Sequence, residues 1–398
     1  MDVIGVIGEF NPFHLGHEAH FQQSRQALGQ DAPIVCVMSG DFVQRGGPAC
    51  MNKHARAEAA ARSGADLVFE LPLPWCGASA ERFAMGAVGL LESLGLVTHL
   101  SFGSEVGSLA PLTALALAAA EPETIGRIKE QMESGMPFAA AREKVLHESL
   151  GQEARLLQSP NNILAVEYLK ALFALRSGIR PMTTLRQQSR HDAVDFGPVR
   201  SAGQLRTMLE AGEDIRPFVP DSTGRIVARE RAAGRGPVVL ERMELAVMSR
   251  LRMRSQEDFC ALPDATEGLG NRLYKAVRDE GSLMGVLAAV KTKRYPLSRL
   301  RRMVMSAVLG VRAGMADGAP PYGRLLASTE RGRALLRQME GKTSVPVVIK
   351  PASARTLAGP AAEIFDLTAA ARDFYVLGYE AAEERKGGSD WRTSPVTV

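Results

Sequence analysis

The sequence predicts a doubly wound α/β domain over residues 1–215 and a mainly α-helical domain over residues 216–398. Two observations predict the first domain: short apolar segments alternate with helical ones, and the strand-like segments are apolar throughout rather than at every second position. Continuous apolarity indicates burial on both faces, as in a parallel sheet covered by helices on each side. The proline- and glycine-containing stretch at 214–225 marks the expected domain boundary.

The elements of the first domain are expected in a regular order. Apolar and β-branched residues predict five strands, at residues 2–10, 32–40, 66–72, 98–105 and 182–188. Alanine-rich or periodically apolar segments predict helices at residues 16–28, 52–65, 79–95 and 201–214, and mostly helical structure over 105–180. This alternation favours a Rossmann-like arrangement.

The second domain shows fewer strand signals. Periodic apolar residues predict helices at residues 239–254, 267–290 and 297–313, a short α/β piece with strands at 323–329 and 344–350, and a last helix at 360–385. The polar tail at 386–398 is expected to be poorly ordered.

The composition is typical of a globular protein. No apolar run is long enough to cross a bilayer, and the N-terminus lacks the basic flank and cleavage site of a signal peptide. We therefore expect a cytoplasmic protein without a membrane partner. The four cysteines form neither a CxxC pair nor a disulfide framework, and they are expected to be reduced, mostly buried thiols.

The segment HLGH at residues 14–17 lies where the first strand gives way to a helix. In an open α/β sheet, ligands bind at the carboxyl ends of the strands, where helix N-termini point free N–H groups outward. His14 and His17 are three residues apart, so both imidazoles can face one ligand, and Gly16 leaves room for its close approach. This arrangement suits a triphosphate, because the imidazoles can donate hydrogen bonds to charge that develops in the transition state.

A metal site is the competing interpretation, because His14, His17 and His20 fall at i, i+3 and i+6. However, the i+6 position lies away from the other two around a helix, and no nearby Cys or Asp completes a ligand set. We therefore predict a phosphate-binding turn and no metal site, with His14 and His17 as catalytic residues.

The pattern HxGH directly after the first strand resembles the signature of the HIGH-type nucleotidyltransferase superfamily. This superfamily includes the class I aminoacyl-tRNA synthetases, and its members form or break an α-phosphate linkage of ATP. Its second motif, ISSTxxR, binds the β- and γ-phosphates late in the domain. Residues Ser201 to Arg206 resemble that motif in its expected place, although Gly203 replaces the usual hydroxyl residue and its phosphate hydrogen bond.

Longer segments resemble one family within that superfamily, the bacterial tRNA(Met) cytidine acetate ligases, over nearly the whole chain. These segments are GEFNPFHLGH, MSGDFVQRGGPA, NKHARAEAAARSGADLVFELP, SPNNILAVEYLKAL and KTKRYPLSRLRRM. The resemblance implies a ligase that uses ATP and free acetate, without acetyl-CoA, to form N4-acetylcytidine at the wobble position (C34) of elongator tRNA(Met). It implies an acetyl-adenylate intermediate with release of AMP and pyrophosphate, and Mg²⁺ is expected with the ATP phosphates.

The resemblance also implies which residues contact ATP. In the first loop they are Ile7, Gly8, Glu9, Phe10, Asn11, Pro12, Phe13, His14, Leu15, Gly16, His17, Glu18, Ala19 and His20; later in the chain they are Gly103, Asn161, Asn162, Arg186, Ser201 and Arg206. From the residues alone, Asn161 and Asn162 could equally be helix caps. Arg190 and His191 are alternatives to Arg186, because the segment after Arg186 aligns with the family only with a gap.

A polar, glycine-rich loop follows the second strand, at the same edge of the sheet as HLGH. We expect Asp41, Gln44 and Arg45 of this loop to select acetate or the target cytidine, although the loop could also be a simple connector. Lys53 and His54 could face the same cleft or only water.

Basic residues gather between 291 and 302, namely Lys291, Lys293, Arg294, Arg299, Arg301 and Arg302. Such a density can bind the phosphates of a tRNA, and it can also be a solvated helix face. Tyr295 could stack on a base, but a structural role is the stronger expectation.

Two other functions are compatible with HxGH. A small-molecule adenylyltransferase shares the motif, but it predicts a chain of about one domain, without the extra basic half. A non-catalytic RNA-binding relative predicts a site in which motif residues have been replaced, and only Gly203 departs from the motif in this way. The sequence leaves the oligomeric state open.

Overall fold

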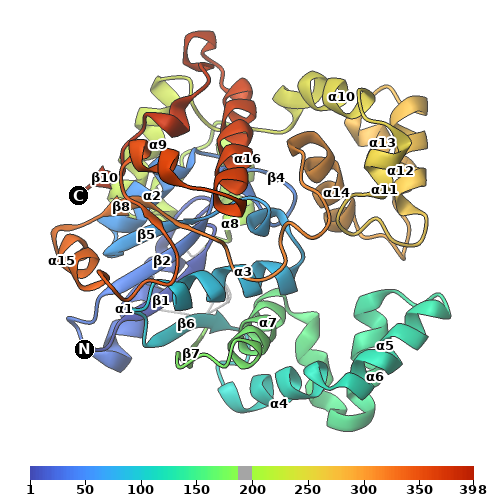
Figure 1. Cartoon of the computed structure of the whole chain (residues 1–398), viewed down its shortest axis with the longest axis horizontal. Coiled ribbons are helices and arrows are strands. Elements are labelled where there is room, and N and C mark those ends of the chain that lie inside the picture. Colours follow the sequence, from blue (N-terminus) through green and yellow to red (C-terminus); the bar gives the residue numbers. More distant parts are fainter. Residues whose placement is uncertain (187–199) are drawn as a thin grey trace.

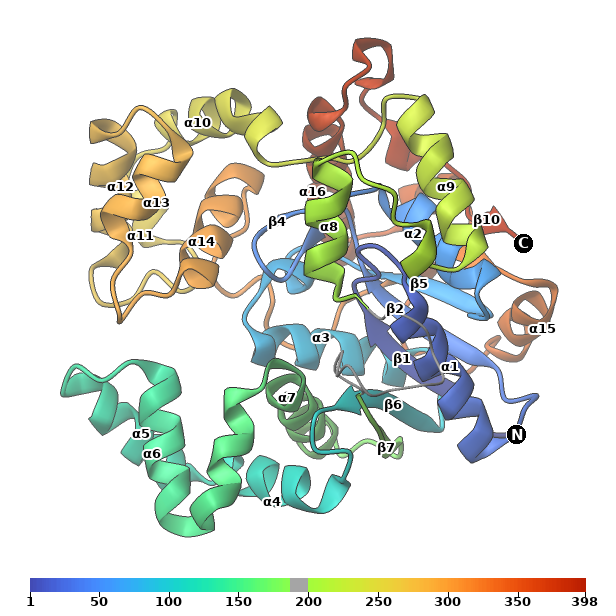
Figure 2. The same ribbon diagram turned by 180° about the vertical axis from the view of Figure 1, so that it is seen from behind.

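The computed structural model describes residues 1–186 and 200–398 (Figure 1). An eight-stranded sheet lies at its centre, with helices on both faces (Figures 1 and 2). The five strands expected in the first domain are present as β1 (Ile4–Gly8), β2 (Ile34–Ser39), β5 (Leu67–Leu71), β6 (His99–Ser104) and β7 (Arg180–Leu185). The strand order is β10-β8-β5-β2-β1-β6-β7, with β9 beside β8, and the five strands run parallel. The α/β fold class is confirmed.

The strands are apolar throughout because helices cover both faces of the sheet. Ile34, Cys36 and Met38 of β2 belong to one buried cluster, which includes residues of α1 (Leu15–Leu28) and α2 (Lys53–Arg62). Val35 and Val37, which alternate with them, belong to the cluster on the other face. That face packs against α3 (Ala80–Ser93) and α7 (Pro160–Ala174).

The second half of the chain adds three strands to the same sheet. They are β8 (Gly323–Ser328), β9 (Val347–Val348) and β10 (Val396–Thr397). Because β8 runs antiparallel to β5, the whole sheet is mixed, although the five strands expected in the first domain run parallel to one another. The short α/β piece at 323–350 is therefore an edge of the first sheet, followed on the chain by α16 (Pro360–Tyr375).

The prediction of a poorly ordered tail over 386–398 is wrong. The Asp390 side chain is buried, and its carboxylate lies 2.6 Å from the Lys53 ammonium. The Trp391 ring meets Phe365 edge to face, with ring centroids 4.7 Å apart. Polar composition misled the prediction because the residues that neutralise and cover this tail, among them Lys53 and Phe365, lie on other elements of the fold.

The remaining helices lie outside the sheet layers or along its edges. They are α4 (Leu109–Ala120), α5 (Pro122–Glu133), α6 (Phe138–Leu150), α8 (Ala202–Glu210), α9 (Asp221–Ala232), α10 (Glu244–Arg252), α11 (Gln256–Cys260), α12 (Leu269–Asp279), α13 (Leu283–Val290), α14 (Leu297–Leu309) and α15 (Glu330–Gln338). Helices α10–α14 form a separate group beside the sheet (Figures 1 and 2). The helix expected over 267–290 is broken into α12 and α13, because Ser282 caps a new helix by accepting a hydrogen bond from the Gly285 N–H.

A small antiparallel hairpin follows β2. It consists of β3 (Phe42–Val43) and β4 (Gly47–Pro48) and lies between the sheet and α14. In the part of the chain that the structure describes, no helix has the length and apolarity needed to span a bilayer.

Candidate active site

The strand order reverses between β1 and β6, the position where doubly wound sheets bind their ligands. The HLGH turn leaves β1 at this point and begins α1. His14 caps the helix: its Nδ1 accepts a hydrogen bond from the Gly16 N–H at 3.0 Å, and the His17 Nδ1 accepts one from the His14 N–H at 3.2 Å. The two imidazoles stack with ring centroids 3.8 Å apart.

These hydrogen bonds determine which ring nitrogen carries the proton in each imidazole. An Nδ1 that accepts a backbone hydrogen bond carries no proton, so each neutral ring carries its proton on Nε2 as a donor. Burial lowers the pKa of His14 to about 3, with a further contribution from the Arg186 charge. Burial, and then the neighbouring His14, also hold the pKa of His17 well below its usual value. The His14 Nε2 is buried without a hydrogen-bond partner among the described residues, as expected for a donor reserved for a ligand.

The loop before the turn is held by its own aromatic side chains. Phe10 and Phe13 are buried and pack with Phe21 of α1 and with the edge of the His17 ring. A side chain at Gly8 would lie 2.7 Å from the Phe10 ring. Within the predicted ATP loop, these residues therefore act as scaffold for the backbone.

His20 differs from the other two histidines. Its Nδ1 lies 2.9 Å from the Thr184 hydroxyl of β7, and its Nε2 lies 3.3 Å from the Ser101 hydroxyl of β6. Burial lowers the pKa of His20 to about 4. Because both ring nitrogens are engaged, His20 ties α1 to the sheet and cannot join His14 and His17 around one ion.

Arg186 lies immediately beyond β7 and beside the histidines. Its guanidinium donates to the Asn161 side-chain oxygen at 2.8 Å, and its charge lowers the pKa of all three histidines. Arg190 and His191, the alternatives to Arg186, lie outside the described residues. Gly103 faces Arg186 with its nearest atoms 3.8 Å from an added side chain, so a small space remains there.

Glu105 is a residue that the sequence interpretation missed. Its carboxylate accepts hydrogen bonds from the Asn161 amide side chain at 2.7 Å and from the Asn162 backbone N–H at 2.8 Å. Asn162 in turn accepts from the Glu105 backbone N–H at 2.9 Å. The two asparagines therefore hold the loop after β6 to the start of α7, where Ser159 is the capping position. The position of Glu105 at the end of a predicted strand was the sequence feature that could have identified it as a site residue.

The second motif lies close to the first loop. Ser201 caps α8 in a capping box with Gln204, and Arg206 donates to the Asn11 backbone oxygen at 2.8 Å. Gly203 lies in the first turn with no atom closer than 3.8 Å to an added side chain, so the missing hydroxyl leaves open space. The structure thus brings the predicted ATP loop (residues 7–20) and α8, which carries Arg206, together.

The predicted substrate loop is the β3–β4 hairpin with its flanks. The Asp41 carboxylate is buried and accepts hydrogen bonds from the Lys53 N–H at 2.8 Å and from the Arg372 guanidinium at 3.1 Å. The Gln44 N–H donates to the Glu9 carboxylate at 2.8 Å, and Arg45 is exposed at the tip. Of the three predicted residues, Gln44 and Arg45 lie on the accessible side.

Lys53 and His54 are both buried, so Lys53 faces neither a cleft nor water. The Lys53 ammonium lies between the carboxylates of Glu70 and Asp390, and Arg324 bridges the same two groups. Burial lowers the pKa of His54 well below its usual value. This ion cluster joins α2 and β5 to β8 and the C-terminal tail.

The basic segment 291–302 is more engaged than its sequence suggests. Lys291 and Lys293 are exposed, but Arg294 forms an ion pair with Glu267 at 2.6 Å, and Arg302 lies 3.5 Å from Asp264. Arg299 donates to the Asp264 backbone oxygen at 2.8 Å.

The group of helices still carries an excess of positive charge. Residues 244–309 contain twelve Lys and Arg against seven Asp and Glu, whereas the whole chain has 48 against 44. The excess of positive charge in this group is larger than that of the whole chain, so the other residues together are slightly acidic. Tyr295 is buried between the Arg272 and Arg299 guanidinium groups, so its role is structural.

The sheet order, the HxGH turn that caps α1, and α8 with Arg206 beside it are together typical of a nucleotidyltransferase. The HIGH Nucleotidyl Transferase family matches residues 1–390 of the chain. Among curated relatives, a tRNA(Met) cytidine acetate ligase of Acetivibrio thermocellus is 36% identical over 409 residues, covering 98% of each chain. A protein of the same name from Caldanaerobacter subterraneus subsp. tengcongensis is 36% identical over 390 residues, covering 96% of each.

A solved structure agrees with these relatives. The crystal structure of Thermotoga maritima TmcAL bound with alpha-thio ATP is 33% identical, with a TM-score of 0.93 over 100% of both chains. The chain belongs to the tRNA(Met) cytidine acetate ligase family of HIGH nucleotidyltransferases, and it is an enzyme of the ligase class.

Proposed function

We propose that this chain joins acetate to N4 of the wobble cytidine (C34) of elongator tRNA(Met) at the expense of ATP, through acetyl-adenylate and without acetyl-CoA. The observation that carries the proposal is the stacked pair of neutral histidines at the N-terminus of α1, with the His14 Nε2 buried and unpartnered among the described residues. The alpha-thio ATP bound by the Thermotoga maritima relative supports ATP as the ligand.

The reaction needs ATP because both reactants are unreactive. Acetate has no leaving group except oxide, and the N4 lone pair of cytosine is delocalised into the ring. In the first step, an acetate oxygen forms a bond to the α-phosphorus while the bond to pyrophosphate breaks. In the second, N4 forms a bond to the acetyl carbon, loses a proton and displaces AMP.

The enzyme's contribution is chiefly positioning and electrostatic stabilisation. His14 and His17 present Nε2–H donors to charge that develops at the α-phosphate, and their neutral state lets them donate without adding a buried charge. Arg186, whose charge acts on His14 and His17, and Arg206, which donates to the Asn11 oxygen, supply fixed positive charge near the predicted ATP loop. Among the described residues, no group of three or more His, Cys, Asp or Glu side chains could hold a metal ion, so Mg²⁺ would enter with the phosphates.

The half of the chain after residue 216, with its basic helices α10–α14, would hold the tRNA. Lysine and arginine contacts to phosphates position an RNA without reading its sequence. The excess of positive charge in this half favours a nucleic-acid acceptor over a free small molecule.

The test is incubation of the purified protein with ATP, radiolabelled acetate and bulk bacterial tRNA, followed by nucleoside analysis. Label in N4-acetylcytidine that disappears when ATP is withheld is the expected result. Pyrophosphate exchange with another small substrate, and no label in RNA, would favour the small-molecule adenylyltransferase. tRNA binding without either reaction would favour the non-catalytic relative.

A further inference from the structure

The β3–β4 hairpin touches both the predicted ATP loop and α14. In the turn, the Gln44 N–H donates to the Glu9 carboxylate at 2.8 Å, and after β4 the Cys50 N–H donates to the Asn11 side-chain oxygen at 2.8 Å. The same Asn11 accepts from Arg206 through its backbone oxygen. The hairpin and its flank are therefore held against both predicted phosphate-binding motifs.

In the turn of the hairpin, Gly46 lies directly against the backbone of α14. Gly46 has a φ of +75°, and a β-carbon built on it would lie 2.5 Å from the Arg301 carbonyl carbon and from the Arg302 nitrogen. Real β-carbons do not approach backbone this closely, so only glycine allows the contact. The adjacent Gly47 has no atom within 4 Å of an added β-carbon.

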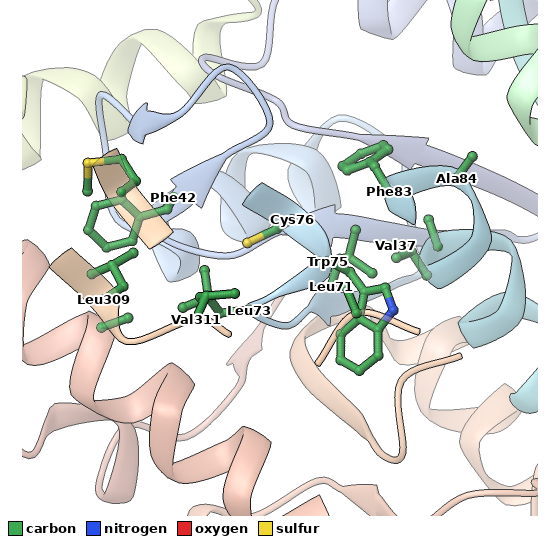
Figure 3. Close-up of a cluster of buried hydrophobic side chains, with 14 of the residues drawn as sticks. Val37, Phe42, Leu71, Leu73, Trp75, Cys76, Phe83, Ala84, Leu309 and Val311 are labelled. Atoms are coloured by element: carbon green, nitrogen blue, oxygen red, sulfur yellow. The ribbon is translucent and has the colours of Figure 1, made fainter. Parts of the chain in front are cut away.

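Buried side chains extend the contact between the hairpin and α14. Phe42 of β3 belongs to the hydrophobic cluster that also contains Leu309 and Val311, at the end of α14 (Figure 3). Beside the glycine contact, the Arg301 Nε is buried without a hydrogen-bond partner among the described residues. The hairpin and α14 are thus packed together from the tip of the turn to the core.

On these contacts we propose that Gly46 is a positioning residue: its backbone contact with α14 sets the distance between RNA held by the basic helices and the acetyl-adenylate at the HLGH turn. The inference rests on the proposed function. It assigns to the hairpin the transfer step, in which two reactants held on different parts of the chain must meet, and leaves the adenylation step to the ATP loop.

The test compares Gly46→Ala and Gly46→Asn with Gly47→Ala. Asn adopts positive φ more readily than Ala, so the Asn variant separates the steric contact from backbone strain. Three quantities are measured for each protein: acetate-dependent ATP–pyrophosphate exchange, tRNA affinity, and the single-turnover rate of N4-acetylcytidine formation from preformed acetyl-adenylate.

Both Gly46 variants are expected to lose transfer rate about 100-fold, the effect of misplacing bound reactants by about 1 Å, while exchange and tRNA affinity stay near wild type. Gly47→Ala should match wild type in all three. Retained exchange shows that the Gly46 variants have folded.

Transfer by the Gly46 variants at the Gly47→Ala rate would overturn the inference, and so would parallel loss of exchange and transfer. Failure of the proposed function is distinguishable from both, because it is read from the wild-type protein alone, as exchange without any N4-acetylcytidine.

Discussion

The HLGH turn and the basic segment 291–302 hold their polar groups in different ways. In the turn, His14 uses one ring nitrogen to cap a helix and keeps the other buried and unpartnered among the described residues. In the basic segment, Arg294 before α14 and Arg302 on α14 already contact Glu267 and Asp264. Leaving a buried polar group unpaired is costly, so the His14 donor indicates a ligand. The Nε atoms of Arg301 and Arg302 are buried without a partner in the same way within the described part of the chain, whereas the exposed Lys291 and Lys293 are readily solvated and indicate less.

The largest effect should come from removing that donor. His14→Ala is expected to lower acetate-dependent ATP–pyrophosphate exchange about 100- to 1,000-fold, the cost of losing one donor to a transition-state oxygen. tRNA affinity should not change, because the basic helices are untouched. The matched control is His147→Ala, an exposed histidine of α6. Full exchange activity in His14→Ala would contradict the inference that the buried His14 donor serves a ligand.

A smaller effect should appear in the pH dependence of stability. The pKa of His14 is lowered to about 3 and that of His20 to about 4, whereas the unfolded chain binds these protons near pH 6.5. Below pH 6.5 the unfolded state therefore binds more protons, and the free energy of unfolding falls as pH falls toward 4. At pH 5.5 the loss should be about 1 kcal/mol for each buried histidine.

Urea unfolding at pH 7.5 and 5.5 measures this difference. His20→Gln should reduce it, since one buried histidine is gone, and His147→Gln should leave it unchanged. An equal pH difference in wild type and His20→Gln would mean that His20 is not held neutral by burial.

The smallest effect should distinguish charges within the basic segment. Replacing exposed Lys291 and Lys293 together by Ala should lower the salt dependence of tRNA binding, measured as the slope of log K against log salt, by about 1.5. Arg294→Gln should lower it by less, because Glu267 already neutralises Arg294. A slope change for Arg294→Gln as large as that of the double variant would show that RNA displaces the ion pair.

The sequence by itself determined the fold class and the centre of the site. Strands that are apolar on both faces can only be buried on both faces, and HxGH after the first strand must lie at a helix N-terminus on the carboxyl edge of the sheet. These are local consequences of periodicity and chain direction. The assignment of His14 and His17 to that turn needed nothing more.

The tertiary structure decided what depends on distant partners. Asn161 forms hydrogen bonds with Glu105 and with Arg186, and Lys53 forms one with Asp390. The partners are 25 to 337 residues apart in the sequence. No periodicity encodes such pairs, because each depends on where the chain returns after many intervening elements. For the same reason the sequence suggested a poorly ordered tail, where the fold provides burial and ion pairs, and it did not reveal the ion pairs of Arg294 and Arg302 in the basic segment.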